Sequence, residues 1–365
     1  MPVSNCGYNL KKIPEAEGRR PNPQVFGRKF QMSRPLSLIL LQSFLICLFL
    51  LVVPLDAAVG PITVTDCRGK TLVFDHPVQR VVCLIESALS GIYMLGQGEK
   101  VVGISTNVYQ EPIFQYYAAL DGRIARRELP APGNWDFVSL EGVIALKPEV
   151  VIMWSQQVEV IAALEERGIP VFGVFIHKRE DIDRELQAFG AMLGVPQRAN
   201  SLLAFVKQEV QRLQAKLADL KPSERPKVYF MWAQSYLETS GRDSMVDELI
   251  SLAGGQNLCG HLSQEHILVR LEQLLLWNPD VIIMWPHPRI GPEDILKEEQ
   301  WQLLAAVQAK RVYQLPEIFL ADLWTLKYLL AVQQLAVWLH PQRFASLDLR
   351  QERRRIFLEL YGIDF

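Results

Sequence analysis

The sequence predicts an α/β fold of two doubly wound parallel-sheet lobes joined by one long helix. Three observations support this class: an internal repeat, strands that alternate with helices around each copy, and a long amphipathic segment between the copies. The composition fits a folded protein, because 49% of the 365 residues are hydrophobic and 21% are charged. The predicted divisions are a leader (1–58), an N-terminal lobe (59–198), an interlobe helix (199–221), a C-terminal lobe (222–345) and a tail (346–365).

The internal repeat consists of residues 139–154, SLEGVIALKPEVVIMW, and residues 270–285, RLEQLLLWNPDVIIMW. The two segments match at seven of sixteen positions without a gap, at an offset of 131. Each contains an apolar helical stretch, a proline that ends the helix, and a short β-branched run typical of a buried parallel strand. Two copies this far apart indicate two similar lobes rather than a solenoid, which needs shorter periods and more copies.

Further short apolar runs predict the remaining strands of the two sheets. They lie at 80–84, 100–104 and 171–175 in the first lobe and at 227–232 and 311–315 in the second. Because strands that alternate with helices are connected by crossovers, we expect both sheets to be parallel.

The segment from Ala199 to Leu220 predicts the interlobe helix. Its apolar residues step by three and four positions and form one stripe: Leu203, Val206, Val210, Leu213, Leu217 and Leu220. We expect Pro222 and Pro226 to end it. A helix of this length spans roughly 33 Å, about a domain diameter, and would act as a stiff joint. The tail carries four arginines and is interpreted as a solvated helix face.

The leader combines a basic segment with an apolar run. Residues 1–34 hold seven basic and two acidic residues, and residues 36–55 are apolar apart from four positions. This order is typical of a secretory signal, although a run of this length can also span a bilayer as an uncleaved anchor. Met32 fits the start of such a signal better than Met1. Both alternatives predict a periplasmic or extracytoplasmic location for the folded part.

Charge, motifs and cysteines exclude several classes of function. Lysine and arginine number 38 against 40 aspartates and glutamates, which argues against a nucleic-acid binder. Phosphate-loop, dinucleotide-binding, nucleophile-elbow and metalloprotease motifs are missing, so no enzyme is suggested. Five cysteines are too few for a disulfide framework. A Cys67–Cys83 bridge stays open, but Cys83 in an apolar strand fits a packed thiol better.

Six segments, taken in order, resemble a known family. They lie at 78–105, 139–152, 168–174, 240–257, 270–283 and 311–316. Over about 60–345 the chain resembles the periplasmic substrate-binding proteins of ABC importers that have a rigid interlobe helix. That family serves iron–siderophore, haem and cobalamin uptake, and some members bind oxyanions. The resemblance implies a ligand cleft between the lobes, a permease dimer in the inner membrane as partner, no catalysis and no cofactor. We expect a monomer.

The resemblance also implies one glutamate on top of each lobe that engages arginines of the permease. Glu141 and Glu272 occupy the matching positions inside the repeat. Two carboxylates at equivalent places suit contact with a two-fold symmetric partner. The alternative is that each carboxylate only stabilises the first turn of its own helix, by about 0.3–1 kcal/mol.

Ligands of this family lie outside the carboxyl ends of the parallel strands, in agreement with the rule for open α/β sheets. The candidate ligand-binding residues are Glu86, Ser87, Tyr109, Trp135, Trp154, His177, Trp232, Tyr236, Arg242, Trp285, His287 and Phe319. Trp135 lies six residues before Glu141, where the cobalamin-binding relative also has a pocket tryptophan. Arg242 could instead belong to a surface turn paired with Asp243.

Two pairs of these candidates have an ordinary alternative role. Trp154 and Trp285 would either line the pocket or only seal the ends of their strands. His177 and His287 would either contact an anion or a metal, or be satisfied loop side chains.

The aromatic side chains favour a large metal chelate, because rings offer contact area to a flat or bulky ligand at low entropic cost. A ferric siderophore ranks first because the family is richest in that role, followed by cobalamin, another corrinoid or haem. Molybdate, tungstate or a bare metal ion is the alternative class, and a bare ion needs three or four converging ligands. A chelatase-like enzyme is the third class, and the leader argues against it.

Overall fold

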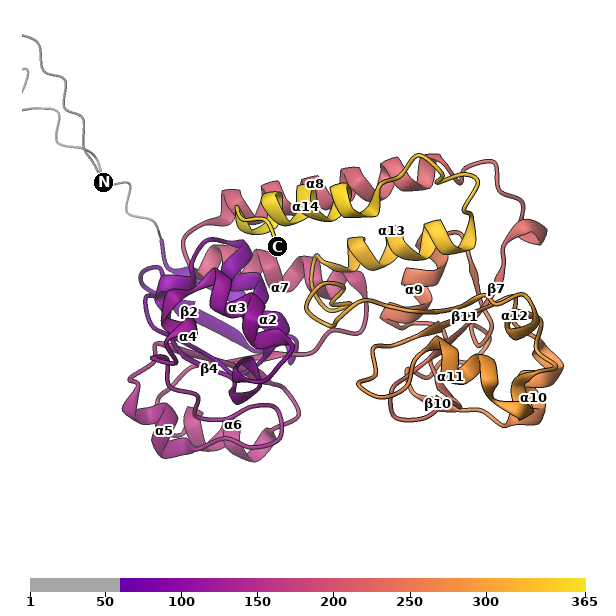
Figure 1. Cartoon of the computed structure of the whole chain (residues 1–365). Coiled ribbons are helices and arrows are strands. Elements are labelled where there is room, and N and C mark those ends of the chain that lie inside the picture. Colours follow the sequence, from indigo (N-terminus) through magenta and orange to yellow (C-terminus); the bar gives the residue numbers. More distant parts are fainter. Residues whose placement is uncertain (1–59) are drawn as a thin grey trace, which may run out of the picture. The chain divides into compact units, whose positions relative to one another are not determined.

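The computed structural model describes residues 60–365, and these residues form two α/β lobes (Figure 1). The leader, with Met32 and the apolar run 36–55, lies outside the described residues. Each lobe contains a four-stranded sheet in which all strands are parallel. The fold class predicted from the sequence is therefore confirmed.

The N-terminal lobe has the strand order β4-β3-β5-β6. The strands are β3 (Val81–Cys83), β4 (Val101–Ile104), β5 (Val150–Trp154) and β6 (Val171–Val174). The helices are α2 (Glu86–Met94), α3 (Ile113–Leu120), α4 (Gly122–Ala125), α5 (Leu140–Ala145), α6 (Val158–Glu165) and α7 (Arg179–Met192). An antiparallel pair of β1 (Ile62–Thr65) and β2 (Thr71–Phe74) precedes them.

The C-terminal lobe has the strand order β12-β11-β7-β9. The strands are β7 (Lys227–Met231), β9 (Gln256–Asn257), β11 (Val281–Met284) and β12 (Val312–Gln314). The helices are α9 (Met245–Leu252), α10 (Leu271–Trp277), α11 (Pro292–Lys297), α12 (Ala305–Gln308) and α13 (Tyr328–Leu339). A short antiparallel pair joins β8 (Glu238–Thr239) to β10 (Ile267–Leu268).

Both sheets are covered on their two faces, as buried parallel sheets require. Successive residues of a strand point to opposite faces, so each strand contributes to two cores. In β5, Val150 and Ile152 join the core on one face, and Val151 and Met153 join the core on the other. The strand β11 of the second lobe is shared between two cores in the same way. This explains why these strands read as continuous apolar runs in the sequence.

The sequence repeat is also a structural repeat. Lys147 and Asn278 stand at equivalent positions after α5 and α10, and both have a left-handed backbone, with φ of 47° and 48°. The acids two residues later, Glu149 and Asp280, both donate their backbone N–H over 2.9 Å to the carbonyl at the start of the neighbouring strand. Each lobe therefore contains its own copy of the same helix–turn–strand unit, and the turn of each copy is joined to the neighbouring strand by an equivalent hydrogen bond.

The helix between the lobes is α8 (Pro196–Ala215), which begins three residues before the predicted Ala199 and ends five residues before the predicted Leu220. Proline at its first turn lacks only an N–H that would have no partner in the helix. Leu217 is buried although it lies beyond the helix, in a turn where its N–H donates to the carbonyl of Gln214. The apolar stripe thus continues past the helix end in a different backbone geometry.

The tail forms α14 (Leu349–Tyr361), which lies beside α8 (Figure 1). Arg355 pairs with Glu209 of α8 at 2.6 Å, as Arg212 of α8 does with Glu352 at 2.8 Å. The prediction that the tail is only a solvated face is wrong, because one side of the helix belongs to the core. Its fully buried side chains are Ile356, Phe357 and Leu360.

Cys67, Cys83 and Cys259 are free thiols, so the Cys67–Cys83 bridge is not formed. Cys83 is fully buried in β3, as its apolar surroundings in the sequence indicated.

Candidate ligand-binding site and docking surface

The carboxyl ends of the N-terminal strands carry a fixed, half-buried carboxyl group. Glu86 begins α2 directly after β3, and its Oε1 accepts a hydrogen bond from the Ser105 hydroxyl at 2.5 Å. The hydroxyl of Tyr117 donates to the Glu86 carbonyl, also at 2.5 Å. Burial raises the pKa of the Glu86 carboxyl. Ser87 is the next residue of α2 and is half-buried.

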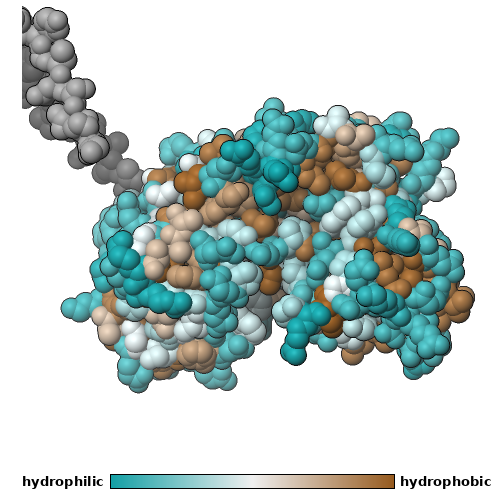
Figure 2. All heavy atoms as spheres, viewed as in Figure 1, coloured by the Kyte–Doolittle hydropathy of each residue, from teal (hydrophilic) through white to brown (hydrophobic). Residues whose placement is uncertain are grey.

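An aromatic group stands at the ends of β5 and β6. The Trp154 ring packs edge-on against Phe175 at 4.9 Å, and Phe175 packs against the His177 ring at 4.2 Å. His177 in turn lies 3.6 Å (Nδ1 to Oε2) from Glu265 of the other lobe. The two lobes therefore meet at the outer edge of this group. The surface is indented between the lobes (Figure 2).

The ends of β7 and β11 carry three tryptophans in mutual contact. Trp232 and Trp285 follow the two strands, and their ring centroids lie 5.3 Å apart. Trp324, from the segment between β12 and α13, packs 6.3 Å from Trp232 and 5.5 Å from Trp285. The indole N–H of Trp232 donates to Ser240 Oγ at 2.9 Å. Trp232 and Trp285 are 5% and 7% exposed, whereas Trp324 is half-buried and covers the cluster.

Both predicted tyrosines have local structural partners. The Tyr109 hydroxyl donates to the carbonyl of Leu129 at 2.8 Å, and the Arg127 guanidinium lies 5.0 Å from its ring centroid. Tyr236 packs edge-on against Trp301, with ring centroids 6.1 Å apart, in the core on the far face of the second sheet. These contacts account for both rings without a ligand.

Phe319 lies in an aromatic core at the junction of the lobes and is 3% exposed. Its ring stacks on Tyr116 of α3 at 4.6 Å, and the Lys327 ammonium lies 3.6 Å from its centroid. Lys327 is fully buried, and its ammonium has no hydrogen-bond partner and lies 3.8 Å from the Asp322 carboxylate. Burial lowers the pKa of Lys327 to about 8 and raises that of Asp322. Phe319 thus shields a buried charge pair.

Three further predicted residues lie in loops, and two of them, Trp135 and Arg242, are exposed. Trp135 is 51% exposed in the loop before α5. Arg242 is exposed, and its Nε lies 3.7 Å from the Asp243 carboxylate, as expected for a paired surface turn. The Nδ1 of His287 accepts hydrogen bonds from two backbone N–H groups of its own loop, at 2.9 and 3.1 Å. Arg242 and His287 therefore have partners of their own, and Trp135 keeps a free ring face.

Sequence reasoning did not include Phe175 and Trp324 among the site residues. Phe175 ends an apolar run that was assigned to a strand, and the strand in fact stops at Val174. Trp324 lies ten residues beyond the end of β12, in a segment without a recognisable pattern. Phe175 directly follows a strand, so it could have been predicted as a site residue from its position in the sequence. Trp324 could be recognised only from its contacts in the tertiary structure.

Glu141 and Glu272 occupy the first turns of α5 and α10, and both are exposed. Both helices lie at the end of their lobe that is remote from α8 and α14 (Figure 1). Within residues 60–365, neither carboxylate takes part in a hydrogen bond or an ion pair. The two charges are therefore free to meet a partner on the same side of the molecule.

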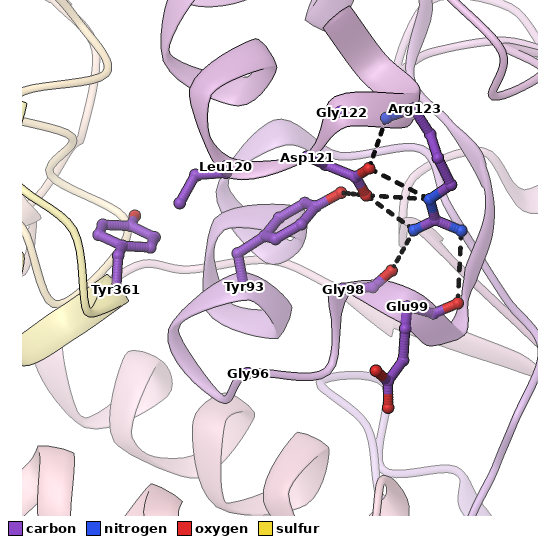
Figure 3. Close-up of a pocket in the computed structure, with 9 residues that line it drawn as sticks. All are labelled: Tyr93, Gly96, Gly98, Glu99, Leu120, Asp121, Gly122, Arg123 and Tyr361. Atoms are coloured by element: carbon purple, nitrogen blue, oxygen red, sulfur yellow. Dashed lines mark hydrogen bonds and ion pairs between the residues drawn. The ribbon is translucent and has the colours of Figure 1, made fainter. Parts of the chain in front are cut away.

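A separate surface pocket of about 520 Å³ lies at the edge of the N-terminal lobe (Figure 3). Two of its charged side chains, Arg123 and Asp121, are already paired with each other. Arg123 donates to the carboxylate of Asp121 and to the carbonyls of Gly98 and Val101, and Tyr93 donates to Asp121 at 2.7 Å. This network holds the loops around α4, and its arginine has little capacity left for a ligand.

Among residues 60–365, no three His, Cys, Asp or Glu side chains come together as ligands of a metal ion. No helix in this range has both the length and the apolar character needed to cross a bilayer.

The sequence pattern of the family described as periplasmic binding protein matches residues 81–318. The molybdate-binding protein MolA of Haemophilus influenzae is 25% identical over 349 residues, which cover 89% of this chain and 97% of that protein. The vitamin B12-binding protein of Vibrio parahaemolyticus is 22% identical over 215 residues, which cover 58% of this chain and 73% of that protein.

Solved structures of similar fold include MolA bound to molybdate, with a TM-score of 0.71 and 22% identity. That match covers 83% of this chain and 98% of MolA. CeuE of Helicobacter pylori with Ni(II) bound has a TM-score of 0.70 at 18% identity and covers 83% of this chain and 97% of that one. These two structures establish a shared fold.

Proposed function

Because the chain belongs to the periplasmic binding protein family, we propose that it captures a metal chelate outside the cytoplasm and delivers it to the permease of an ABC importer. A ferric siderophore is the favoured ligand. Relatives are described as molybdate-binding, vitamin B12-binding and ABC transporter substrate-binding proteins, which carry solutes and are not enzymes. The protein is accordingly proposed to bind its solute without converting it.

The tryptophan cluster of the second lobe is the observation that carries this proposal. Trp232, Trp285 and Trp324 gather where two parallel strands end, and Trp154 with Phe175 stands at the corresponding ends in the first lobe. Aromatic rings present wide, rigid contact surfaces, which suit the organic shell of a chelate. The half-buried Trp324 is the ring placed to exchange contacts with a ligand.

Cobalamin or haem fits the same reasoning, because both are metal chelates with large organic surfaces. A bare cation is disfavoured, since no metal-ligand cluster exists among residues 60–365. Molybdate is the second candidate, because MolA is similar over nearly the full length of both chains.

The proposal is tested by tryptophan fluorescence of the mature protein. Ferric catecholate and hydroxamate siderophores, haem, cobalamin and molybdate are titrated at fixed salt. We expect saturable quenching by one chelate, weakened at least tenfold in Trp324→Ala. The matched control is Trp338→Ala, because Trp338 is half-buried and stacks on Tyr313 away from the strand ends. A response to molybdate alone would contradict the chelate proposal and support the second candidate.

Delivery is proposed to use Glu141 and Glu272 as contacts with the permease dimer, with the protein acting as an exported monomer. Their equivalent positions, free carboxylates and shared side of the molecule support this role. We expect Glu141→Gln with Glu272→Gln to abolish uptake while ligand affinity is unchanged. Unchanged uptake in the double variant would contradict the docking role.

A further inference from the structure

Each of the two free glutamates is preceded by an exposed apolar side chain at the same position of the repeat. Phe137 is 56% exposed and Leu268 is 76% exposed. Phe137 lies four residues before Glu141, and Leu268 lies four residues before Glu272, so the offset of 131 holds for both pairs.

The residues that follow show that this exposure is built into the repeat. Val138 packs against the core under the first sheet, and Val269 is 5% exposed in the corresponding core of the second lobe. In both lobes the chain therefore turns one apolar residue inward and the preceding one outward. A single exposed apolar residue is common on protein surfaces, but here one recurs at the equivalent position of both lobes beside a free carboxylate.

The helices that carry the glutamates extend the apolar surface. Ile144 lies three residues after Glu141 on α5 and is 37% exposed, and Leu276 lies four residues after Glu272 on α10 and is 83% exposed. Side chains three or four positions apart share one helix face. Figure 2 shows apolar surface at the corresponding end of both lobes. In the sequence, each glutamate thus lies between two exposed apolar residues.

We propose that these two patches, Phe137–Glu141–Ile144 and Leu268–Glu272–Leu276, are the contact surfaces for the two subunits of the membrane permease. The inference rests on the proposed function and adds an apolar contact to the charged one. A two-fold symmetric partner presents the same surface twice, so equivalent positions on two pseudo-symmetric lobes meet equivalent groups. Two free carboxylates call for a partner with a cationic group at the centre of each half.

The apolar side chains give these ion pairs their strength. A solvent-exposed ion pair contributes little to an association, because water screens both charges. Apolar contacts around the pair exclude water and allow the charged centre to act as a hot spot. The patches also differ, with an aromatic ring in the first and two leucines in the second. Because a two-fold symmetric partner is unchanged by a half-turn, the two orientations of the lobes on it are equivalent, and this difference does not select between them.

The proposal is tested by photo-cross-linking of the full chain in cells that contain its importer. The probe p-benzoylphenylalanine replaces Phe137 or Leu268, and the controls carry it at Val73 in β2 and at Leu358 in α14. These control positions are 58% and 51% exposed and lie on other surfaces. We expect cross-links from 137 and 268 to a multispanning permease subunit, identified by mass spectrometry, and none from the controls. Equal cross-linking from all four sites would overturn the proposal.

A binding measurement separates this proposal from the docking function itself. Phe137→Ser with Leu268→Ser is expected to weaken binding to the permease complex in nanodiscs at least tenfold, whereas Val73→Ser with Leu358→Ser leaves it unchanged. If only Glu141→Gln with Glu272→Gln weakens binding, the apolar contacts are refuted and the proposed function stands. If the protein binds no permease complex even without substitution, the proposed function fails.

Discussion

The ammonium of Lys327 and the carboxylate of Asp322 form a buried pair whose energy can be measured by a double-mutant cycle. Asp322→Asn leaves a buried ammonium without a counter-charge, and Lys327→Met leaves a buried carboxylate that keeps only the backbone N–H of Trp324. Removal of one partner from such a pair costs about 3 kcal/mol of unfolding free energy. Each single variant is therefore expected to lose about that amount.

The double variant is expected to lose far less than the sum of the singles. At 3.8 Å and an effective dielectric constant near 20, the attraction between the two charges is about 4 kcal/mol. The double variant should accordingly lose about 2 kcal/mol rather than about 6 kcal/mol. Urea unfolding followed by far-ultraviolet circular dichroism at pH 7 measures all four proteins, provided that the m-value is unchanged.

Two further measurements test this calculation of the coupling energy. The folded state releases the Lys327 proton near pH 8, whereas the unfolded state holds it to about 10.5. The wild type should therefore gain stability as the pH rises from 8 to 10, and Lys327→Met should not. The exposed pair of Arg343 and Asp219 is the control, and its cycle should be additive. Additive losses in the Lys327–Asp322 cycle would refute the calculated coupling.

Three other predictions concern the loops and the buried groups. Gly241→Ala should cost about 2 kcal/mol of unfolding free energy, because the new Cβ would lie 2.3 Å from the carbonyl oxygen of Leu262. Urea unfolding measures this loss, and an unchanged unfolding midpoint would contradict the prediction. Ellman's reagent should label the exposed Cys67 in the native protein and the buried Cys83 only in urea, and equal labelling rates would be inconsistent with that burial. Burial lowers the pKa of His340. As the pH falls below about 6.5, the unfolded state therefore binds a proton at this histidine before the folded state does, and the free energy of unfolding declines. Thermal unfolding measured between pH 7 and pH 5 should show a smaller decline for His340→Gln than for the wild type.

The fold could be predicted from the sequence because its strands are covered on both faces and therefore read as unbroken apolar runs. VVIMW after Pro148 and VIIM after Pro279 are such runs, and both are strands. The end of the interlobe helix was misplaced, because Leu217 keeps the helical spacing of apolar residues after the helix has stopped. The buried side of α14 was missed because its arginines dominate the composition of the tail.

The candidate site was less accessible to sequence reasoning, because the position after a strand does not determine where a side chain points. Trp232 and Trp285 follow neighbouring strands of one sheet and meet each other, whereas Tyr236, only four residues beyond Trp232, packs into the core on the opposite face. Phe319 was expected to face a ligand, and instead it packs against Lys327. Contacts between segments far apart in the sequence decide these cases, and no local pattern reports them.

The last helix of the chain completes the first lobe. The hydroxyl groups of Ser90 and Tyr361 lie 2.5 Å apart although 271 positions separate them. Closing a loop of that length costs roughly 5 kcal/mol of chain entropy, and native contacts recover it only after the end of the chain is present. During synthesis, or during export with the amino end first, the first lobe therefore emerges before α14, and its core cannot yet be completely packed. Folding of the first lobe thus depends on α14, and a nascent protein interrupted before α14 would expose apolar surface to proteases and chaperones.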